Sequence, residues 1–423
     1  MPHIDSWVPV PTGSDFTIYN LPYGAFMHQG RARLGVAIGE RILDLYAVGD
    51  AGLLDGFCDR ALVMAPSLNP LLAAGPTVWK ALRLRLAALL RSDDRGDAAL
   101  RERNSDAFLV DQKTASMVVP MEIGDYVDFY SSLEHVTNLG KLFRPNSEPL
   151  LPNWRHMPIA YHGRSSTVVI DGTPIVRPNG QRKPPGGDAP VFGPSQRLDI
   201  ELEVGFVTGP GNRLGEPISI AKTREHIFGL VLVNDWSARD IQAWEYQPLG
   251  PFLGKSFATT ISPWIVTLDA LEPFRAGGPK QEPEPLHYLR VFDRASYDIS
   301  LAVDLSSEKM RAARTAPVTI ARTNFKELYW SMAQQLAHVT VNGTQIRPGD
   351  LYASGTISGS GAEAQGSLIE LTQNATQPIH LPDGEVRGFL QDGDEVTLRG
   401  WCVQGDFRIG FGAARGVIAP AKS

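Results

Sequence analysis

The chain has 423 residues, of which 43% are hydrophobic and 20% charged, and its 40 basic and 46 acidic side chains give a net charge of −6. This composition excludes a disordered chain, which would be poorer in apolar residues, and the acidic balance provides no positive field for a nucleic-acid partner. The two cysteines, Cys58 and Cys402, are too few for a disulfide framework or a zinc site and suit a reducing compartment.

Targeting and membrane signals are missing from the sequence as well. Residues 1–5 carry neither the basic start nor the apolar core of a secretory signal. No uncharged apolar run reaches the roughly 18 residues that a membrane helix needs. We therefore expect a cytoplasmic protein without a membrane partner, long enough for two or three domains.

The first part of the chain is predicted to combine short strands with one helix. Residues 1 to about 70 are typical of short strands broken by turns, whereas apolar residues at helical spacing predict a helix over Thr77–Leu90. A break in the pattern places a domain boundary within 110–122. We expect one domain over residues 1–118 and a second over 119–423.

Strands dominate the prediction for the second part. Leu198–Phe206 alternates apolar with mainly acidic residues, which predicts a half-buried strand with its carboxylates on the other face. His226–Val233 is a continuous apolar run, typical of a strand buried on both sides, and a short helix is expected over Ser237–Trp244. With 41 glycines and 32 prolines spread along the chain, the fold is predicted to be mainly β, in the α+β class.

Towards the C-terminus the pattern predicts one more helix and several turns. Apolar residues over Phe325–Leu336 recur at helical spacing, with Thr323 or Asn324 as the cap. His338–Ile346 is predicted to be a hairpin around an Asn-Gly turn. Further turns are predicted at Asp383-Gly384 and Asp392-Gly393.

Several common catalytic motifs fail on spacing or are missing. Gly250–Ser256 is similar to a phosphate-binding loop, but position 249 is leucine and no strand leads into it. Gly209–Gly215 follows a strand, but its third glycine is one position late for a dinucleotide site. The sequence has no Gly-x-Ser-x-Gly and no His-Glu-x-x-His motif. If the chain is a hydrolase, something other than a serine activates the water.

Four acidic residues are candidates for a cation site. Glu201 and Glu203 lie two apart on one predicted strand and therefore share a face. Asp235 ends the apolar strand, where a buried carboxylate needs a partner, and Asp128 is the fourth candidate. Carboxylates without clustered His or Cys are the ligand set of a hard cation, Mg²⁺ or Ca²⁺. A solvated outer face is the alternative for the two glutamates.

Three polar residues near Asp235 have two interpretations each. Arg239 and Gln242 share a helix face and either stabilise an oxyanion or point to solvent. Lys255 lies in a Gly- and aromatic-rich loop shortly before Thr259 and is either a buried ion-pair partner or an electrostatic catalyst.

Two further residues could form a base and its partner. His135 lies seven residues after Asp128, on the same helix face if this segment is helical, although a lone histidine is more often structural. Glu370, an acid among apolar residues, fits either an ordinary alternating strand or a residue that orients a base.

Eight short segments have sequences that are characteristic when they occur together. They are Asp128–Ser132 with His135, Leu151–Trp154, Tyr161–Arg164, Asp199–Glu203, Asn234–Gln242, Gly250–Trp264, Pro348–Leu351 and Ser354–Gly359. Together they resemble the fumarylacetoacetase (fumarylacetoacetate hydrolase) family, and the resemblance runs from about residue 20 almost to the end of the chain.

The resemblance implies both a fold and a reaction. The fold would be a small N-terminal SH3-like β-barrel domain followed by a mixed β-roll catalytic domain, assembled as a homodimer. The reaction would be hydrolysis of a carbon–carbon bond in the β-diketone 4-fumarylacetoacetate to fumarate and acetoacetate, the last step of tyrosine and phenylalanine breakdown. Such a reaction needs a base, an oxyanion site and an electron sink for the departing carbanion.

The resemblance also implies roles for individual residues. The Ca²⁺ ligands would be Asp128, Glu201, Glu203 and Asp235, and the residues that bind Mg²⁺ would be Asp235, Lys255 and Thr259. The general base would be His135, oriented by Glu370. The oxyanion site would consist of Arg239, Gln242 and Lys255. Substrate contacts would come from Tyr130, Arg144, Tyr161, Gln242, Tyr246 and Thr356. The sequence departs from the family pattern in residues 141–149 and 361–366.

Two other functions are alternatives. An acylpyruvase-type diketo acid hydrolase of the same superfamily would release pyruvate and a fatty acid, but the complete motif set and the N-terminal domain argue against it. A non-catalytic, metal-stabilised scaffold on the same fold would keep the metal ligands and lose the base and oxyanion residues, whereas this sequence has both sets.

Overall fold

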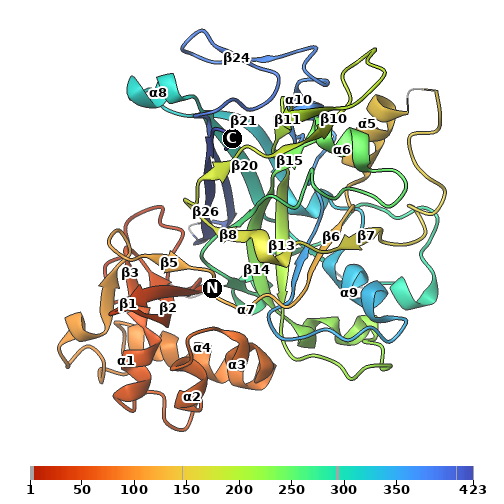
Figure 1. Ribbon diagram of the computed structural model, residues 1–423. Coiled ribbons are helices and arrows are strands. Elements are labelled where there is room, and N and C mark those ends of the chain that lie inside the picture. The colour runs from red at the N-terminus through yellow and green to blue at the C-terminus, as the bar shows by residue number, and fades with distance from the viewer. Residues whose placement is uncertain (1–3, 145, 292–294, 406, 423) are drawn as a thin grey trace.

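The N-terminal region is built on a five-stranded sheet. The structure, a computed structural model, describes residues 4–144, 146–291, 295–405 and 407–422 (Figure 1). Every neighbouring pair of strands in this first sheet is antiparallel. In spatial order the strands are β4 (Leu109–Asp111), β3 (Arg41–Asp44), β2 (Arg31–Ile38), β1 (Tyr23–His28) and β5 (Met117–Val118).

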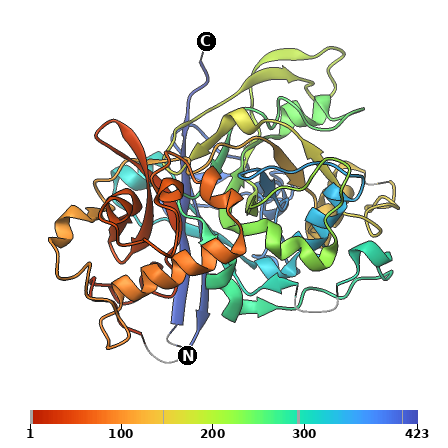
Figure 2. The same cartoon turned by 90° about the horizontal axis from the view of Figure 1, so that it is seen from below.

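Short helices replace part of the strands predicted for residues 1 to about 70. The carboxylate of Asp44 accepts from the backbone N–H of Tyr46, so the chain becomes helical directly after β3. The helices are α1 (Leu45–Asp50), α2 (Arg60–Val63), α3 (Asn69–Ala73) and α4 (Pro76–Leu90), and a 3₁₀ turn follows at Ser105–Ala107. Helix α4 confirms the helix predicted over Thr77–Leu90. Figure 2 shows these helices, in orange, beside the red strands.

The buried face of α4 leads to a stability prediction. Leu86 is fully buried in the core, whereas Leu84, on the same helix, is 62% exposed. Leu86→Ala is expected to lower the free energy of unfolding by about 2–5 kcal/mol, because it leaves a cavity. The matched Leu84→Ala should change it by less than about 0.5 kcal/mol. Denaturant unfolding followed by circular dichroism measures both, and similar effects of the two substitutions would contradict this packing.

The N-terminal region and the rest of the molecule share a continuous apolar core. Trp79 of α4 and Tyr23 of β1 pack edge-on against Phe228, with ring centroids 5.1 and 5.4 Å apart. The backbone of Tyr23 also pairs with that of Ile265. Strand β5 ends at Val118, and the division of the chain after that residue stays a prediction.

A mixed sheet of eight strands forms the centre of the molecule. Its neighbouring strands are antiparallel except for two parallel pairs, β6 with β22 and β8 with β16. In spatial order the strands are β7 (Ala160–His162), β6 (Tyr126–Phe129), β22 (Leu351–Ala353), β13 (Leu202–Thr208), β14 (Ile227–Asp235), β16 (Thr259–Ile261) and β8 (Val168–Ile170), with β17 (Val266–Thr267) paired to β14. Every residue of β14 is buried, which confirms the strand predicted over His226–Val233.

The strand predicted over Leu198–Phe206 is divided in the structure. Its first part, β12 (Leu198–Asp199), pairs with β15 (Ser237–Ala238), and β13 begins only at Leu202. Every residue of β13 is buried, so the prediction of half-burial was wrong. The acidic face is covered because other parts of the chain bring cationic side chains against it.

A second large sheet packs against the first across the main hydrophobic core. Its strands are β21 (Val318–Asn324), β20 (Ser300–Ser306), β25 (Glu395–Gln404), β26 (Phe407–Ala419) and β9 (Ile175–Val176). The smaller pairs are β10 (Asn179–Arg182) with β11 (Val191–Pro194), β18 (Arg275–Ala276) with β19 (Ser296–Tyr297), and β23 (Ile379–His380) with β24 (Val386–Arg387). The architecture is a mixed α+β fold in which sheets predominate, with a curled half-barrel sheet in the C-terminal part.

Short helices and 3₁₀ turns connect these strands. The α-helices are α5 (Leu133–Phe143), α6 (Arg239–Glu245), α7 (Leu268–Leu271), α8 (Glu308–Ala312), α9 (Met332–Thr340) and α10 (Leu368–Leu371). The 3₁₀ turns are Ser165–Thr167, Ile220–His226, Glu272–Phe274, His287–Leu289 and Phe325–Glu327. Helix α6 confirms the short helix predicted over Ser237–Trp244, two residues later than expected. None of the helices in the described ranges has both the length and the apolar character that crossing a bilayer requires.

Two predictions near α9 were wrong. The helix expected over Phe325–Leu336 is divided. Asn324, one of the two predicted caps, caps only the 3₁₀ turn Phe325–Glu327. Helix α9 begins after Ser331, whose side chain and that of Gln334 form a reciprocal capping box. The hairpin expected over His338–Ile346 is absent from this fully described segment, because α9 continues to Thr340. The Asn-Gly pair turns the chain at the helix end. The predicted turns at Asp383-Gly384 and Asp392-Gly393 are confirmed, and both glycines have positive φ.

Candidate active site

The predicted site residues gather around one cavity of about 410 Å³. Its walls come from β6, β7, α5, α6 and the loops that follow α6 and β22. The predicted residues that line it are Asp128, Tyr130, His135, Arg144, Tyr161, Glu201, Arg239, Gln242, Tyr246, Lys255 and Thr356. Glu203, Asp235 and Glu370 lie behind the wall and form hydrogen bonds to lining residues, and Thr259 binds to Asp235.

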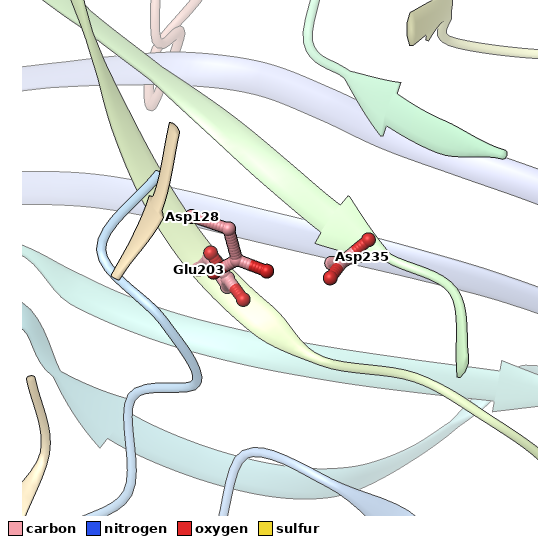
Figure 3. A group of neighbouring side chains, drawn as sticks. All are labelled: Asp128, Glu203 and Asp235. Atoms are coloured by element: carbon pink, nitrogen blue, oxygen red, sulfur yellow. The ribbon is translucent and has the colours of Figure 1, made fainter. Parts of the chain in front are cut away.

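Three carboxylates from three strands meet beside this cavity. Asp128 of β6, Glu203 of β13 and Asp235 at the end of β14 each offer an oxygen within 4.8 Å of the others, and all three residues are buried. Figure 3 shows the three side chains as neighbours, with Asp235 at the arrowhead of its strand. The order of the strands explains the meeting, because β22 joins β6 to β13, which pairs with β14.

The chemistry of this triad fits a divalent cation. One oxygen of Glu203, Oε2, accepts from the backbone N–H of Gly355 at 3.0 Å. The other, Oε1, is buried and finds no hydrogen-bond partner among the residues that the structure describes. An all-oxygen donor set with an unused buried carboxylate oxygen is what a hard cation binds.

Burial and mutual repulsion act on the same carboxylates. Burial raises the pKa of Asp128 to about 6, and the charge of Asp235 adds to this effect, whereas Arg164 opposes it. Burial, reinforced by Asp128 and Asp235, also raises the pKa of Glu203 well above its usual range. A bound divalent cation would favour the ionised form of each carboxylate.

Glu201 lies next to the triad and pairs with cations of the chain itself. Its Oε1 accepts from Arg239 Nη1 at 2.7 Å, and its Oε2 accepts from Lys255 Nζ. Burial alone would raise the pKa of Glu201, but Lys255 and Arg239 hold it below its usual range. Glu201 is 6% exposed and Glu203 fully buried, so the alternative of a solvated outer face was wrong.

Lys255 and Thr259 both bind Asp235. Lys255 Nζ donates to Asp235 Oδ2 at 2.6 Å, and the Thr259 hydroxyl donates to Asp235 Oδ1 at 3.1 Å. Lys255 is therefore a buried ion-pair partner, one of the two interpretations left open by the sequence. Its assignment to catalysis and to Mg²⁺ stays a prediction.

Arg164 is a site residue that was missed as an individual candidate. Its Nη2 donates to Asp128 Oδ2 at 2.5 Å and to Asp235 Oδ2 at 2.7 Å. Its guanidinium carbon lies over the rings of Tyr126 and Tyr161, at 4.7 and 4.9 Å from their centroids. The backbone of Arg164 is left-handed, with φ of 64°, which is unusual for a residue with a side chain. The only sequence signal was the segment Tyr161–Arg164.

A histidine and a glutamate form the candidate base. His135 Nδ1 lies 2.6 Å from Glu370 Oε2, and both residues are buried. Burial alone would raise the pKa of Glu370, but His135 and hydrogen bonds hold it below its usual range. These bonds come from Asn138 at 3.0 Å, Ser358 at 3.0 Å and Ser367 at 2.6 Å.

The local structure around this pair differs from both predictions made for it. Asp128 lies on β6, whereas His135 lies in the first turn of α5, which begins only after its cap, Ser132. The prediction that the two residues share a helix face was therefore wrong. Glu370 lies on α10, not on an alternating strand. The remaining interpretation, a residue that orients a base, agrees with its contact to His135.

Arg239 and Gln242 share one face of α6, as the sequence predicted. Arg239 Nη1 donates to Gln242 Oε1 at 3.2 Å. Arg239 is buried, so the solvent-facing alternative was wrong for this residue. Its Nη2 has no hydrogen-bond partner within the described part of the chain, and this side chain lines the cavity. A buried N–H donor without a protein partner is available to form a hydrogen bond to an oxygen atom of a ligand.

The other lining residues add polar groups to the walls. The ring of Tyr130 meets that of His135 edge-on, with centroids 5.4 Å apart. Arg144 Nη2 donates to the carbonyl of Pro149 at 2.7 Å. Two buried polar atoms, Arg144 Nε and Thr356 Oγ1, lack a partner among the residues with described positions. Contacts between these residues and a substrate stay predictions.

Comparison with known proteins agrees with the fold. Residues 126–419 match the family model described as "Fumarylacetoacetate (FAA) hydrolase C-terminal", and residues 19–120 match "Fumarylacetoacetase N-terminal". A solved fumarylacetoacetate hydrolase from the psychrophile Exiguobacterium antarcticum has the same fold, with a TM-score of 0.53 and 16% identity over 95% of this chain and 99% of that one. The family-model matches, together with the fold, place the chain in the fumarylacetoacetate hydrolase class.

Close relatives narrow this class to one family. The human protein named fumarylacetoacetase is 51% identical over an alignment of 424 positions, which covers 98% of this chain and 99% of that protein. The fumarylacetoacetase of Arabidopsis thaliana is 49% identical over an alignment of 425 positions, which covers 99% of both chains. The chain belongs to the fumarylacetoacetase family.

Proposed function

We propose that this protein hydrolyses the carbon–carbon bond of 4-fumarylacetoacetate and releases fumarate and acetoacetate. The observation that carries the proposal is the composition of one cavity. It places the His135–Glu370 pair, a buried arginine with an unused donor and a carboxylate triad around the same space. These groups supply the base, the oxyanion site and the cation site that cleavage of a β-diketone needs.

The base acts on water through the ring nitrogen that Glu370 does not contact. Glu370 accepts from His135 Nδ1, which leaves Nε2 as the acceptor for a water proton. The water oxygen then attacks the carbonyl carbon, and the carbon–carbon bond breaks as the carbonyl re-forms. The proton taken up by His135 is available to the departing carbon, which becomes the methyl group of acetoacetate.

Hydrogen-bond donors of the chain, two of them cationic, stabilise the charge that develops at the carbonyl oxygen. Arg239, Gln242 and Lys255 line the cavity and form the proposed oxyanion site. Arg144 and the hydroxyls of Tyr130, Tyr161 and Tyr246 would bind the carboxylates at the ends of the substrate, and Thr356 would add a further contact.

The cation site is proposed to take Ca²⁺ or Mg²⁺. Asp128, Glu203 and Asp235 would be its ligands, with Glu201 as the fourth proposed carboxylate for Ca²⁺. Lys255 and Thr259, proposed with Asp235 for Mg²⁺, both bind Asp235. When bound, a divalent cation supplies Lewis-acid stabilisation of the departing enolate. The all-oxygen donor set supports this class of cation.

We also propose a cytoplasmic homodimer. Both cysteines are free and buried, which suits a reducing compartment. The homodimer rests on the membership of the family, as the sequence resemblance implied. Sedimentation at several concentrations measures the oligomeric state.

Replacing Glu370 tests the orientation of the base. In Glu370→Gln the side-chain amide either donates to His135 Nδ1 or accepts from it only weakly. His135 therefore loses the tautomer that leaves Nε2 free to accept a proton, and kcat is expected to fall by about 10²–10⁴-fold. The matched Glu385→Gln removes a carboxylate that pairs with Arg387, away from the cavity, and should leave kcat unchanged. A Glu370→Gln variant with the wild-type kcat would contradict the assigned role.

Product identification tests the reaction itself. The purified protein is incubated with 4-fumarylacetoacetate and with an acylpyruvate, and the products are identified by NMR. Fumarate and acetoacetate in equal amounts from the first substrate are expected. Pyruvate and a fatty acid from the second substrate, with no turnover of the first, would favour the acylpyruvase-type hydrolase instead.

A further inference from the structure

Asp199 is a buried carboxylate to which the mechanism above gives no role. It ends β12 and is fully buried. Its Oδ2 accepts from Arg239 Nε at 2.7 Å. The two oxygens also accept from the backbone N–H groups of Leu368, at 2.7 Å, and Ile369, at 3.1 Å. These two residues begin α10, the helix that carries Glu370.

The contact with α10 replaces the cap that this helix lacks. Ser367 precedes the helix, but its side chain makes no capping hydrogen bond; its hydroxyl donates to Glu370 instead. Asp199, which is 169 residues away from Leu368 in the sequence, satisfies the free N–H groups of the first turn.

The contact with Arg239 fixes the plane of its guanidinium group. Asp199 binds Nε, and Glu201 binds Nη1 at 2.7 Å. Two carboxylates bound to two different nitrogens of a planar group define its orientation. The third nitrogen, Nη2, is the one without a partner in the described residues, and Arg239 lines the cavity.

We propose that Asp199 is a positioning residue that sets the Arg239 donor and the His135–Glu370 pair relative to each other. The proposal rests on the proposed function, because it concerns the oxyanion donor and the base of that reaction. Asp199 acts through Arg239 and through α10. Because one carboxylate binds both, a displacement of either element changes the geometry of the other.

The first test replaces Asp199 with asparagine. Both oxygens of Asp199 accept hydrogen bonds from N–H groups. In Asp199→Asn an amide NH₂ replaces one oxygen and cannot accept, so the hydrogen bond to Arg239 or to the backbone of α10 is lost. We expect kcat to fall by about 100-fold with KM changed less than about threefold, because positioning of the base and donor is lost while the substrate contacts remain. A wild-type kcat would overturn the proposal.

Asp394 provides a matched control. It is also fully buried, accepts from Arg387 at 2.8 and 2.9 Å and from the backbone N–H of Gln391 at 2.8 Å. Asp394→Asn removes the same type of ion pair from a part of the molecule that does not line the cavity. It should lower stability as Asp199→Asn does and leave kcat unchanged; equal losses of kcat in both would assign Asp199 to stability alone.

A double-mutant cycle separates positioning from a general structural effect. If Asp199 acts through α10 and Glu370, the variant carrying both Asp199→Asn and Glu370→Gln should be within about threefold of the slower single variant. Fully multiplied losses would overturn the proposal. Should Asp199→Asn not fold, Asp199→Glu keeps the charge and lengthens the side chain, and the same non-additive loss of kcat is expected of it.

Hydrogen exchange of residues 367–371 tests the positioning without substrate. The backbone N–H groups of α10 should exchange at least about tenfold faster in Asp199→Asn than in Asp394→Asn, because the cap is lost. Unchanged exchange would overturn the proposal. If wild-type protein does not cleave 4-fumarylacetoacetate, the proposed function fails, and the exchange result still decides whether Asp199 fixes α10.

Discussion

His135→Asn is expected to lower kcat by about 10²–10⁴-fold, since it removes the base while an amide can still donate to Glu370. Retention of that hydrogen bond avoids leaving a buried carboxylate without a partner. His135 is not one of the three carboxylate residues that would bind the cation. The affinity for Mg²⁺ or Ca²⁺ should therefore stay within about threefold of the wild-type value. Steady-state kinetics and isothermal titration calorimetry measure the two quantities.

His338 supplies the matched control for this substitution. It is partly buried and, like His135, has a hydrogen-bonding partner, because its Nδ1 lies 3.0 Å from the hydroxyl of Tyr288. It does not line the cavity, so His338→Asn should leave kcat unchanged. A His135→Asn variant with a near-normal rate would remove His135 from the role of base.

Asp235→Asn is expected to lose cation binding and activity together. The substitution removes one of three converging carboxylates and the charge that Arg164 and Lys255 neutralise. The affinity for Mg²⁺ or Ca²⁺ should fall by at least about 100-fold, since the loss of a ligand exceeds the 10–100-fold effect of a residue behind the ligands. Calorimetric titration of metal-stripped protein measures the affinity, and kcat is followed at saturating cation.

Asp304 offers a comparison away from the cavity. It pairs with Arg399 through two hydrogen bonds, at 2.5 and 3.0 Å. Asp304→Asn should therefore change stability slightly and leave both cation affinity and kcat unchanged. An Asp235→Asn variant that binds cation as tightly as the wild type would exclude Asp235 from the cation site.

Local patterns predicted many elements, but they did not show which faces are covered. The alternation over Leu198–Phe206 predicted extended backbone, whereas burial of its acidic face depends on Arg239 and Lys255, which arrive from later parts of the chain. The Asn-Gly pair near residue 343 favours a hairpin by local preference. In the fold it follows α9, because tertiary packing extends the helix to Thr340.

The types of the site residues were predictable, and their contacts were not. Carboxylates at the end of a buried strand indicated a hard cation. The meeting of Asp128 with Glu203 and Asp235 depends on the pairing of four strands, which no local pattern specifies. The contact of His135 with Glu370 joins residues 235 positions apart. Arg164 was not predicted as an individual site residue. Its side chain reaches the triad through a left-handed backbone conformation, which the local sequence pattern does not indicate.

Loss of 4-fumarylacetoacetate absorbance by metal-stripped protein tests the central claim most directly. The rate is measured before and after addition of Mg²⁺ or Ca²⁺ at increasing concentration. The proposed mechanism predicts little turnover in the stripped protein and cation-dependent recovery, with fumarate and acetoacetate as products. Absence of turnover with either cation, from protein shown to be folded and to bind the cation, would contradict the proposed function.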